Sequence, residues 1–144
     1  MTTIIARFAL LFVIAALIIL GATGNLFSTS PLVITVQLLA VALSVWARVS
    51  FPSGTFRTEA KPAAVTFIRR GPYRFVRHPM YSATLLFVWS GILSHLGLWT
   101  LVLGIIITAI VASRIVLEER ILQQQYPEYE AYTRETKAVI PFLL

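Results

Sequence analysis

The sequence predicts an all-α integral membrane protein with four transmembrane helices. Charged residues make up only 12% of its 144 residues and hydrophobic residues 58%, whereas a soluble domain is about 25% charged. Residues 8–47 contain no Asp, Glu, Lys or Arg, and the ionisable side chains of residues 78–113 are His78, Tyr81 and His95 alone. One bilayer crossing takes ~20 helical residues, so each run is long enough to cross twice. We therefore expect two helical hairpins in a single domain.

Turn-forming residues divide each apolar run into two helices. Gly, Asn, Ser and Pro interrupt the first run at residues 21–31, and "SHLGLW" interrupts the second at residues 94–99. The expected spans are residues 5–21, 32–50, 80–95 and 98–116. The domain then comprises a first transmembrane hairpin over residues 1–50, a cytoplasmic loop over 51–78, a second transmembrane hairpin over 79–117 and a cytoplasmic tail helix over 118–144.

The basic residues indicate how the helices are oriented. Residues 48–77 hold seven of the twelve Lys and Arg residues against one acid, Glu59, and the two short turns hold none. By the positive-inside rule we expect the central loop and both termini on the cytoplasmic side of a bacterial or archaeal membrane. The net charge of +6 then describes one face that contacts membrane lipids, and it does not indicate nucleic-acid binding. Arg7 and the apolar residues after it also fit a cleavable signal peptide, which we favour less because a second apolar helix follows at once.

The residues that the sequence lacks exclude several kinds of site. There is no Asp and no Cys, so Ser-His-Asp triads and thiol chemistry are absent. His78 and His95 lie at opposite ends of one predicted helix, ~25 Å apart at 1.5 Å per residue, so they cannot bind one metal ion. No G-x-G-x-x-G follows a strand, which removes a Rossmann-type nucleotide site. We therefore predict no metal site.

The stretch "RRGPYRFVRHPMYS", residues 69–82, is the first candidate for chemistry. Gly-Pro-Tyr reads as a turn, and Pro79 suits the first position of a helix, which places His78 at or beside the N-cap. Free N–H groups at a helix N-terminus favour an anion. Membrane topology and lipid contact alone explain Arg69 and Arg70. They need only positive charge, and so do not explain Gly-Pro-Tyr or the His-Pro-x-Tyr sequence at the helix start.

The second candidate is the charged stretch over residues 113–141. Arg114 and Glu118 are four residues apart and so share one helix face. Polar residues continue this helix beyond the membrane until Pro127 interrupts it. Charge at the end of a span is unfavourable unless it is paired or used, so we expect a role for these groups.

Equal counts from the turn predict that the two stretches meet. His78 lies eighteen residues before Leu96, and Arg114 lies eighteen residues after it. In antiparallel neighbouring helices these positions lie at the same depth. The groups expected to face each other are Arg77, His78 and Tyr81 on one helix, and Arg114, Glu118 and Glu119 on the other. Such a pocket suits a polar cytosolic cofactor that meets an apolar or lipid-anchored substrate.

At these residues the sequence resembles the isoprenylcysteine carboxyl methyltransferase family and its phospholipid N-methyltransferase relatives. The resemblance rests on "GPYRFVRHPMY" followed, after a helical hairpin, by "EERILQQQYPEYEAYTRETKAVIP". It covers about half of the chain and is more specific for the superfamily than for a substrate. It implies a membrane methyltransferase that uses S-adenosylmethionine, with the cofactor between the third and fourth spans and the tail helix.

The resemblance also implies roles for individual residues. The expected cofactor-binding residues are Tyr73, Arg77, His78, Tyr81, Glu118, Glu119, Tyr129 and Tyr132. Arg114 and Glu119 are the expected catalytic residues, nearest the reacting centre. The chain departs from the family where it has Ser82-Ala83 in place of a glycine. It also lacks an arginine before Ile140-Pro141, for which Arg134 or Lys137 are candidate replacements.

The methyl acceptor and two other functions stay open. We expect a hydrophobic or lipid-anchored small molecule, with a carboxylate favoured over an amine, hydroxyl or thiol, and the oligomeric state is open. A membrane reductase that uses NADPH is an alternative, because sterol and isoprenoid reductases have a similar Tyr-rich ending with Ile-Pro. A membrane protein without enzymatic activity, whose basic loop binds lipid or a partner, is the other.

Overall fold

The computed structural model describes the backbone of residues 2–50 and 68–139, and within these ranges the side chains from residue 11 onward. The helices are α1 (Thr2–Ala22), α2 (Pro31–Val49), the 3-10 helix η2 (Gly71–Arg74), α3 (Pro79–Ser94), α4 (Leu98–Gln125) and α5 (Tyr129–Glu135). No strand occurs in these two ranges, which confirms the predicted all-α class for them. Prolines stand at the first or second position of α2 and α3, where a missing N–H group and a fixed φ angle favour the helix start.

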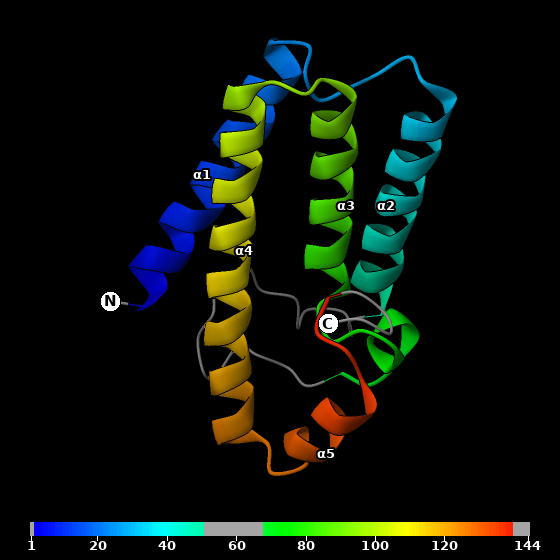
Figure 1. Ribbon diagram of the computed structural model, residues 1–144. Helices are drawn as coiled ribbons and strands as arrows, with labels where there is room; N and C mark the ends of the chain where they lie inside the picture. The colour runs from blue at the N-terminus through cyan, green and yellow to red at the C-terminus, as the bar shows by residue number, and fades with distance from the viewer. Residues whose placement is uncertain (1, 51–67, 140–144) are drawn as a thin grey trace.

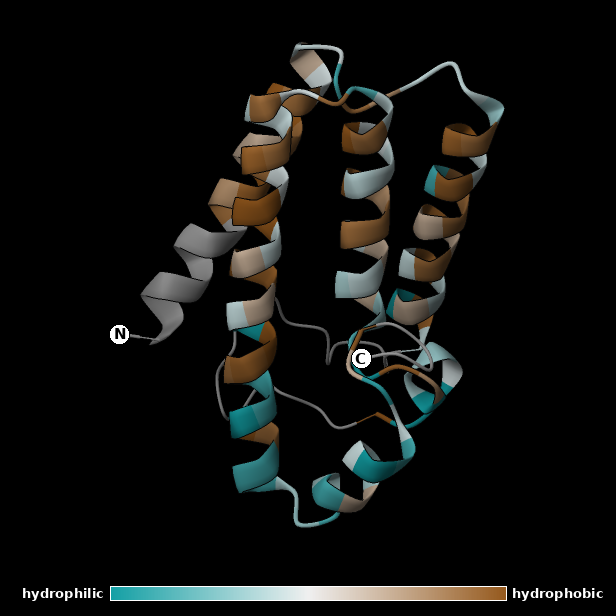
Figure 2. Ribbon diagram, viewed as in Figure 1, coloured by the Kyte–Doolittle hydropathy of each residue, from teal (hydrophilic) through white to brown (hydrophobic). Residues whose placement is uncertain are grey.

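Two of the helices, α2 and α4, are long and apolar enough to cross a membrane. α4 has 28 residues, or ~42 Å of helix, which exceeds the ~30 Å hydrocarbon layer by about two turns. Figure 2 shows where the excess lies, because hydrophilic residues are concentrated at the lower end of α4 and in α5, whereas the upper parts of the long helices are mostly apolar. A span that starts at Leu98 therefore leaves the hydrocarbon layer near Leu117.

The expected first hairpin does not form as a packed pair. α1 lies against α4, and α2 lies against α3, so that α1 and α2 flank the α3–α4 hairpin on opposite sides (Figure 1). The connection between them crosses the end of this hairpin. Its Leu26 side chain is buried, and the Leu26 carbonyl accepts a hydrogen bond of 2.8 Å from Gln37. Apolar periodicity predicts helices but not their neighbours, so the sequence did not indicate which helices pack together.

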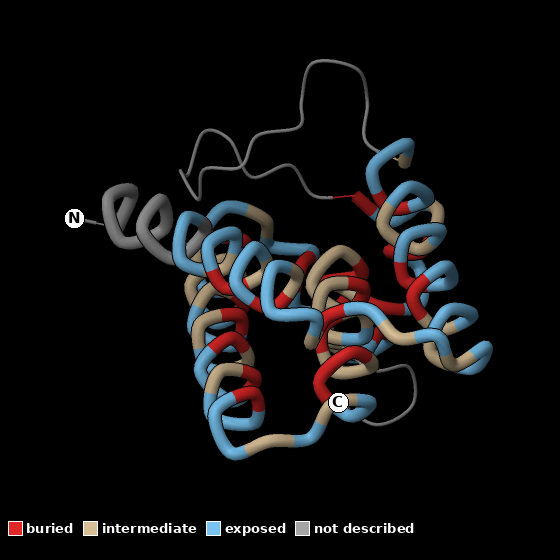
Figure 3. The backbone as a smooth tube through the Cα atoms, turned by 90° about the horizontal axis from the view of Figure 1, so that it is seen from above, coloured by how far each residue is buried: buried red, intermediate tan, exposed pale blue. Residues whose placement is uncertain are grey.

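The hydrophobic core lies between α1, α3 and α4. Its buried residues are Ala16, Leu20, Leu26, Val88, Ile92, Ile107, Val111 and Ile115. Figure 3 shows buried positions on the sides of the helices that face one another and exposed positions on the outer sides. Gly91 of α3 allows a close approach of the backbone, since a Cβ atom there would lie 2.2 Å from the Leu26 carbonyl oxygen. Ala16 and Leu20 are the buried core residues that α1 contributes.

The lower end of the molecule is closed by the residues after α4. α4 ends at Gln125, just before Pro127, and the separate short helix α5 follows. α4 thus continues past the expected boundary at residue 118, and the interruption expected at Pro127 separates it from α5, because proline cannot continue a helix. Residues 140–144 of the expected tail helix lie outside the described residues. Residues 136–139, called the C-terminal segment below, then run beside residues 75–78, with a parallel bridge between Val76 and Lys137.

Candidate active site

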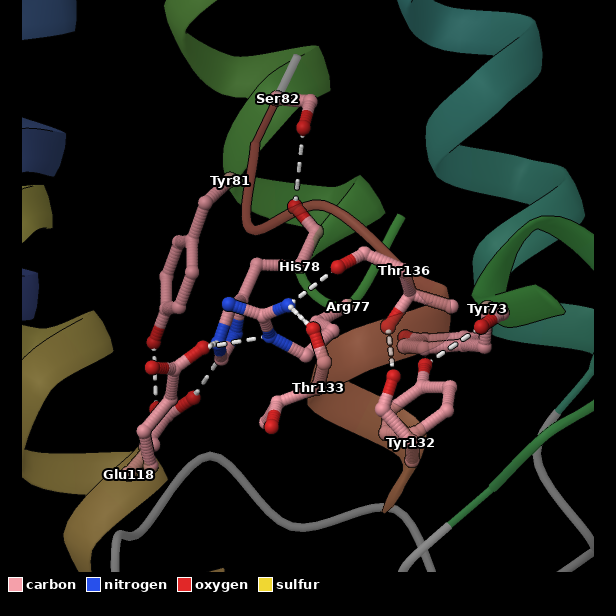
Figure 4. A network of polar contacts seen from close by, with 10 residues as sticks. Tyr73, Arg77, His78, Tyr81, Ser82, Glu118, Tyr132, Thr133 and Thr136 are labelled. Atoms are coloured by element: carbon pink, nitrogen blue, oxygen red, sulfur yellow. Dashed lines mark hydrogen bonds and ion pairs between the residues drawn. The ribbon is translucent and has the colours of Figure 1, made fainter. Parts of the chain in front are cut away.

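Three elements meet at the lower end of the helices to form a polar site (Figure 4). His78 is the N-cap of α3 and Pro79 follows it in the first turn, so this helix start fixes the directions of the side chains from Arg77 to Tyr81. Glu118 and Glu119 are neighbours on α4, on the part of that helix that extends past the apolar residues. The third element is the C-terminal segment with α5.

Glu119 is held by the two residues before α3. The Nε atom of Arg77 donates a hydrogen bond of 2.8 Å to Oε1 of Glu119. The Nε2 atom of His78 lies 3.2 Å from the same oxygen. His78 is buried and the Glu119 side chain is 21% exposed, so this contact joins a buried ring to a carboxylate that a ligand can still reach.

Glu118 is held by a second line of contacts that runs through Tyr81. The Tyr81 hydroxyl donates to Oε1 of Glu118 and accepts a hydrogen bond of 3.0 Å from Nε of Arg114. Arg114 also pairs directly with Glu118, with 3.6 Å between Nη2 and Oε1. The Nδ1 atom of His78 lies 3.8 Å from Oε2 of Glu118. The His78 ring is therefore placed between the two carboxylates.

The far side of Arg77 is attached to the C-terminal part of the chain. Its Nη1 atom donates to the carbonyl oxygens of Thr133, at 3.2 Å, and Thr136. The backbone N–H groups of Arg77 and His78 donate to the carbonyls of Lys137, at 2.8 Å, and Ala138, at 3.0 Å. The helix start and the C-terminal segment are thus joined by both side-chain and backbone hydrogen bonds.

The tyrosines support the site from the side of α5. The Tyr132 hydroxyl donates to the backbone carbonyl of Tyr73, and its ring lies 5.7 Å from that of Tyr129. The Tyr73 ring packs in an apolar cluster with Ala47 and Ile68. Burial is the main cause that raises the pKa of Tyr132 to about 12 and raises that of Tyr129 as well. Both hydroxyls therefore remain protonated at neutral pH.

The charges around Glu119 keep it ionised. This residue lies beyond the predicted span over residues 98–116. The hydrogen bond from His78, together with the hydrogen bond and charge of Arg77, lowers the pKa of Glu119 below its usual range, although partial burial opposes the shift. Two guanidinium groups face two carboxylates here, so that the site is close to neutral before any ligand binds.

The structure brings together most of the residues that the sequence singled out. The depth argument is confirmed, because contacts within hydrogen-bonding distance join the start of α3 to the end of α4. Tyr73 lies apart from this network, with its ring in the cluster against α2 and its carbonyl bound to Tyr132. Arg134 pairs with Glu130 on the exposed face of α5, at 2.6 Å, and is not directed at the site.

Sequence reasoning missed the contacts made by the C-terminal segment. Thr133 and Thr136 act through backbone carbonyls, and Val139 accepts a hydrogen bond from the Ser82 hydroxyl through its own. Every residue type has a backbone carbonyl, so no sequence signal could have identified these partners. Ser82 is the exception, since a hydroxyl in the first turn of a helix is a polar group that needs an acceptor.

The donors and acceptors fit a ligand that carries both charge signs, as S-adenosylmethionine does. Within the described ranges, Oε1 accepts every hydrogen bond to Glu118 and to Glu119. Both Oε2 atoms therefore keep the capacity to accept from an ammonium or hydroxyl group. Arg114 and His78 lie beside them and are suited to a carboxylate. No group of three His, Cys, Asp or Glu residues that could hold a metal ion occurs in the part of the chain searched.

Comparison with known proteins identifies the family of the chain. A family model described as phospholipid methyltransferase matches residues 31–129, which is more than half of the chain. The chain therefore belongs to the phospholipid methyltransferase family, and the resemblance noted from the sequence is confirmed. This family and the apolar helices together indicate a membrane protein of a methyltransferase family.

One curated relative is similar over nearly the whole chain. It is the cobalt-zinc-cadmium resistance protein CzcN of Cupriavidus metallidurans, which is 29% identical over 148 aligned residues. The alignment covers 95% of this chain and 62% of the relative, so the chain spans less than two thirds of that protein. No solved structure matches the chain.

Proposed function

We propose that the protein transfers a methyl group from S-adenosylmethionine to a hydrophobic or lipid-anchored acceptor at the cytoplasmic face of the membrane. The observation that carries the proposal is the meeting of His78 and Tyr81 with Glu118 and Glu119 at one end of the apolar helices. This end offers a polar cofactor access from water and an apolar acceptor access from lipid. Membership of the phospholipid methyltransferase family supports the reaction class.

The cofactor would be held by residues from all three elements of the site. The Oε2 atoms of Glu118 and Glu119, which accept no hydrogen bond within the described residues, would accept from its ammonium and hydroxyl groups. His78 and Tyr81 would line the same side. The rings of Tyr129 and Tyr132 would close the site from α5, with Tyr73 behind them. When bound, S-adenosylmethionine supplies an electrophilic methyl group on a sulfonium.

Arg114 and Glu119 are the residues that we place nearest the reacting centre. A carboxylate acceptor is the first candidate, because Arg114 could orient it through a charged hydrogen bond. Attack of an anion on a cation removes two charges, so a low-dielectric site favours this reaction once both partners are bound. For an amine acceptor, Glu119 would instead take up the proton that leaves the nitrogen. In either case the site has to align the two reactants and exclude water.

We further propose that all four long helices cross the membrane, with the site and both termini on the cytoplasmic side. Large apolar side chains are exposed along the outer surfaces, such as Ile18 at 65%, Leu32 at 73% and Ile105 at 55%. Exposed apolar surface of this extent is characteristic of protein that faces lipid. The basic residues from Arg69 to Arg77 lie at the same end as the two glutamates, as the positive-inside rule requires.

Ligand-dependent stability of the purified full chain tests the cofactor. S-adenosylhomocysteine at 100 times its Kd is expected to add about 2.7 kcal/mol of stability by mass action, which raises the unfolding temperature in detergent. Glu119→Gln and His78→Ala should remove this shift, and Glu130→Gln on the exposed face of α5 should keep it. Stabilisation by NADPH in place of S-adenosylhomocysteine would favour the reductase alternative, and no stabilisation by either would favour the protein without enzymatic activity.

The acceptor is accessible to a direct experiment. Membranes that contain the protein are incubated with S-adenosylmethionine labelled in its methyl group, and the labelled product is extracted and identified. Membranes with the Glu119→Gln variant serve as the control. Release of the label by mild base would indicate a methyl ester and hence a carboxylate acceptor, whereas a stable label in lipid would indicate an amine or hydroxyl.

A further inference from the structure

Arg77 is distributed over partners on two different elements. Its Nε atom is bound to Glu119 of α4, at 2.8 Å. Its Nη1 atom is bound to the carbonyls of Thr133, at 3.2 Å, and Thr136, at the end of α5. The side chain is only 13% exposed. Arg77 therefore lies between α4 and α5 and binds both. These contacts use most of its N–H donors.

The carbonyls that Arg77 binds are those that a helix end leaves without internal partners. The last four carbonyls of a helix make no intrahelical hydrogen bond, and together they carry a partial negative charge. Thr136 is the C-cap of α5, and Thr133 lies in its last turn. A planar guanidinium can serve these carbonyls with one nitrogen and a carboxylate with another, which a lysine ammonium does less well.

The C-terminal segment also fixes the backbone at Arg77 and His78. The N–H groups of Arg77 and His78 donate to the carbonyls of Lys137 and Ala138. One helical turn further along, the Ser82 hydroxyl donates to the carbonyl of Val139. The C-terminal segment thus holds the residues that contact Glu119, and Arg77 in turn holds the end of α5 from which this segment starts.

We infer that Arg77 is a positioning residue that couples the docking of the C-terminal segment to the orientation of Glu119. Arg77 occupies Oε1 of Glu119 and so leaves Oε2 directed to the ligand. Without the docking of α5 and the C-terminal segment, the guanidinium loses the carbonyls of Thr133 and Thr136, and its hold on the carboxylate weakens. This inference rests on the proposed function, because it assigns Glu119 the ligand that the proposal names.

The coupling has a signature in the pH dependence of ligand binding. His78 first, and then Arg77, lower the pKa of Glu119. The other charged and titratable groups around it are Glu118 and Arg114 on α4, Tyr81 on α3 and Tyr129 on α5. A lowered pKa keeps the carboxylate ionised as the pH falls, and the binding that depends on it is lost only when the pH passes through this lowered value. Removal of Arg77 therefore moves the loss of binding to higher pH.

Calorimetric titration of the purified full chain with S-adenosylhomocysteine tests the inference, from about pH 7 down to about pH 3, below the ordinary Glu pKa of ~4.3. Arg77→Gln should weaken binding at the upper end of this range about tenfold or more, as expected for a lost charged hydrogen bond. Its loss of binding on acidification should also begin at a higher pH than in the wild type. Arg77→Lys restores the positive charge and should restore the pH profile while it recovers only part of the affinity.

The matched control is Arg134→Gln, which removes the same charge from the exposed face of α5, where Arg134 pairs with Glu130. It should leave affinity and pH profile unchanged. The inference is overturned if Arg77→Gln binds like the wild type, or if Arg77→Lys restores the affinity but leaves the pH profile shifted. Should Arg77→Gln fail to fold, Arg77→Lys alone carries the comparison. A wild-type protein that does not bind S-adenosylhomocysteine rejects the proposed function instead, so the two failures are distinguishable.

Discussion

At the scale of single residues, the Tyr81 hydroxyl fixes the relative positions of two charged side chains, Arg114 and Glu118. It accepts from Arg114 and donates to Glu118, and thereby links a cation and an anion that are otherwise 3.6 Å apart. The side chains of Arg114 and Glu118 are only 12% and 21% exposed. Partly buried charges depend on such partners, because water reaches them poorly.

Tyr81→Phe is therefore expected to weaken binding of S-adenosylhomocysteine about tenfold, the effect of one hydrogen bond to a charged group. The ring is retained, so packing against the core should change little. Calorimetric titration gives the affinity, and thermal unfolding without ligand serves as the control for stability. Unchanged affinity would show that ligand binding does not depend on the hydroxyl contacts that position Arg114 and Glu118.

The residues of the site were predictable to different degrees. Equal counts from Leu96 predicted that His78 and Arg114 lie at one depth, because a short turn between antiparallel helices fixes their register. The contacts of Arg77 with Thr133 and Thr136 were not predictable, since they depend on how the seven-residue helix α5 packs against the rest of the protein. Backbone carbonyls leave no trace in side-chain chemistry, and their partners become visible only in the fold.

At the scale of helices, the sequence located the elements well and their neighbours poorly. The spans expected at 32–50 and 80–95 correspond to Pro31–Val49 and Pro79–Ser94. Proline at a helix start and the loss of apolar character at its end are local signals, so these bounds could be predicted. The packing of α1 on α4 is not local, and a lipid-facing surface looks in sequence much like a helix-facing one.

Gly91 gives a test of this packing, because its missing side chain lets α3 approach the connection between α1 and α2. A Cβ atom would lie 2.2 Å from the backbone carbonyl oxygen of Leu26, which cannot simply rotate away. Gly91→Ala should destabilise the protein by about 1–3 kcal/mol through overpacking, although alanine is the better helix former. Unfolding in a denaturing detergent titration measures the change.

Gly97→Ala is the control, since a Cβ atom there would make only ordinary contacts, with the nearest at 3.6 Å. Its stability should remain within about 0.5 kcal/mol of the wild type, as for most surface substitutions. Equal stability of both variants would show that α3 does not approach the connection as closely as described.

At the scale of the whole molecule, the polar groups are concentrated at one end. The lower end of α4, α5 and the C-terminal segment lie below the apolar parts of the helices (Figures 1 and 2), and Glu118 and Glu119 belong to the C-terminal part of α4. The connection between α1 and α2 lies at the opposite end. If the long helices cross the membrane as proposed, these two ends are on opposite sides of it.

The sequence has no cysteine, so single cysteines can report on this orientation without background. Thr29→Cys in the exposed connection should react with a membrane-impermeant maleimide on intact cells. Glu130→Cys on α5 should react only after the membrane is opened. Labelling of both positions from the same side would contradict the proposed three crossings between them, by α2, α3 and α4.

The pairing of residues 136–139 with residues 75–78 has a consequence for how the protein is made. The ribosome adds the C-terminal segment after all four long helices. If these cross the membrane as proposed, they can enter the bilayer while the N–H groups of Arg77 and His78 still lack their carbonyl partners. Membrane insertion and completion of the proposed site are then separate events in time. Lipid governs the first and a few paired peptide groups govern the second, so the proposed site of a nascent chain is incomplete until residues 136–139 have docked.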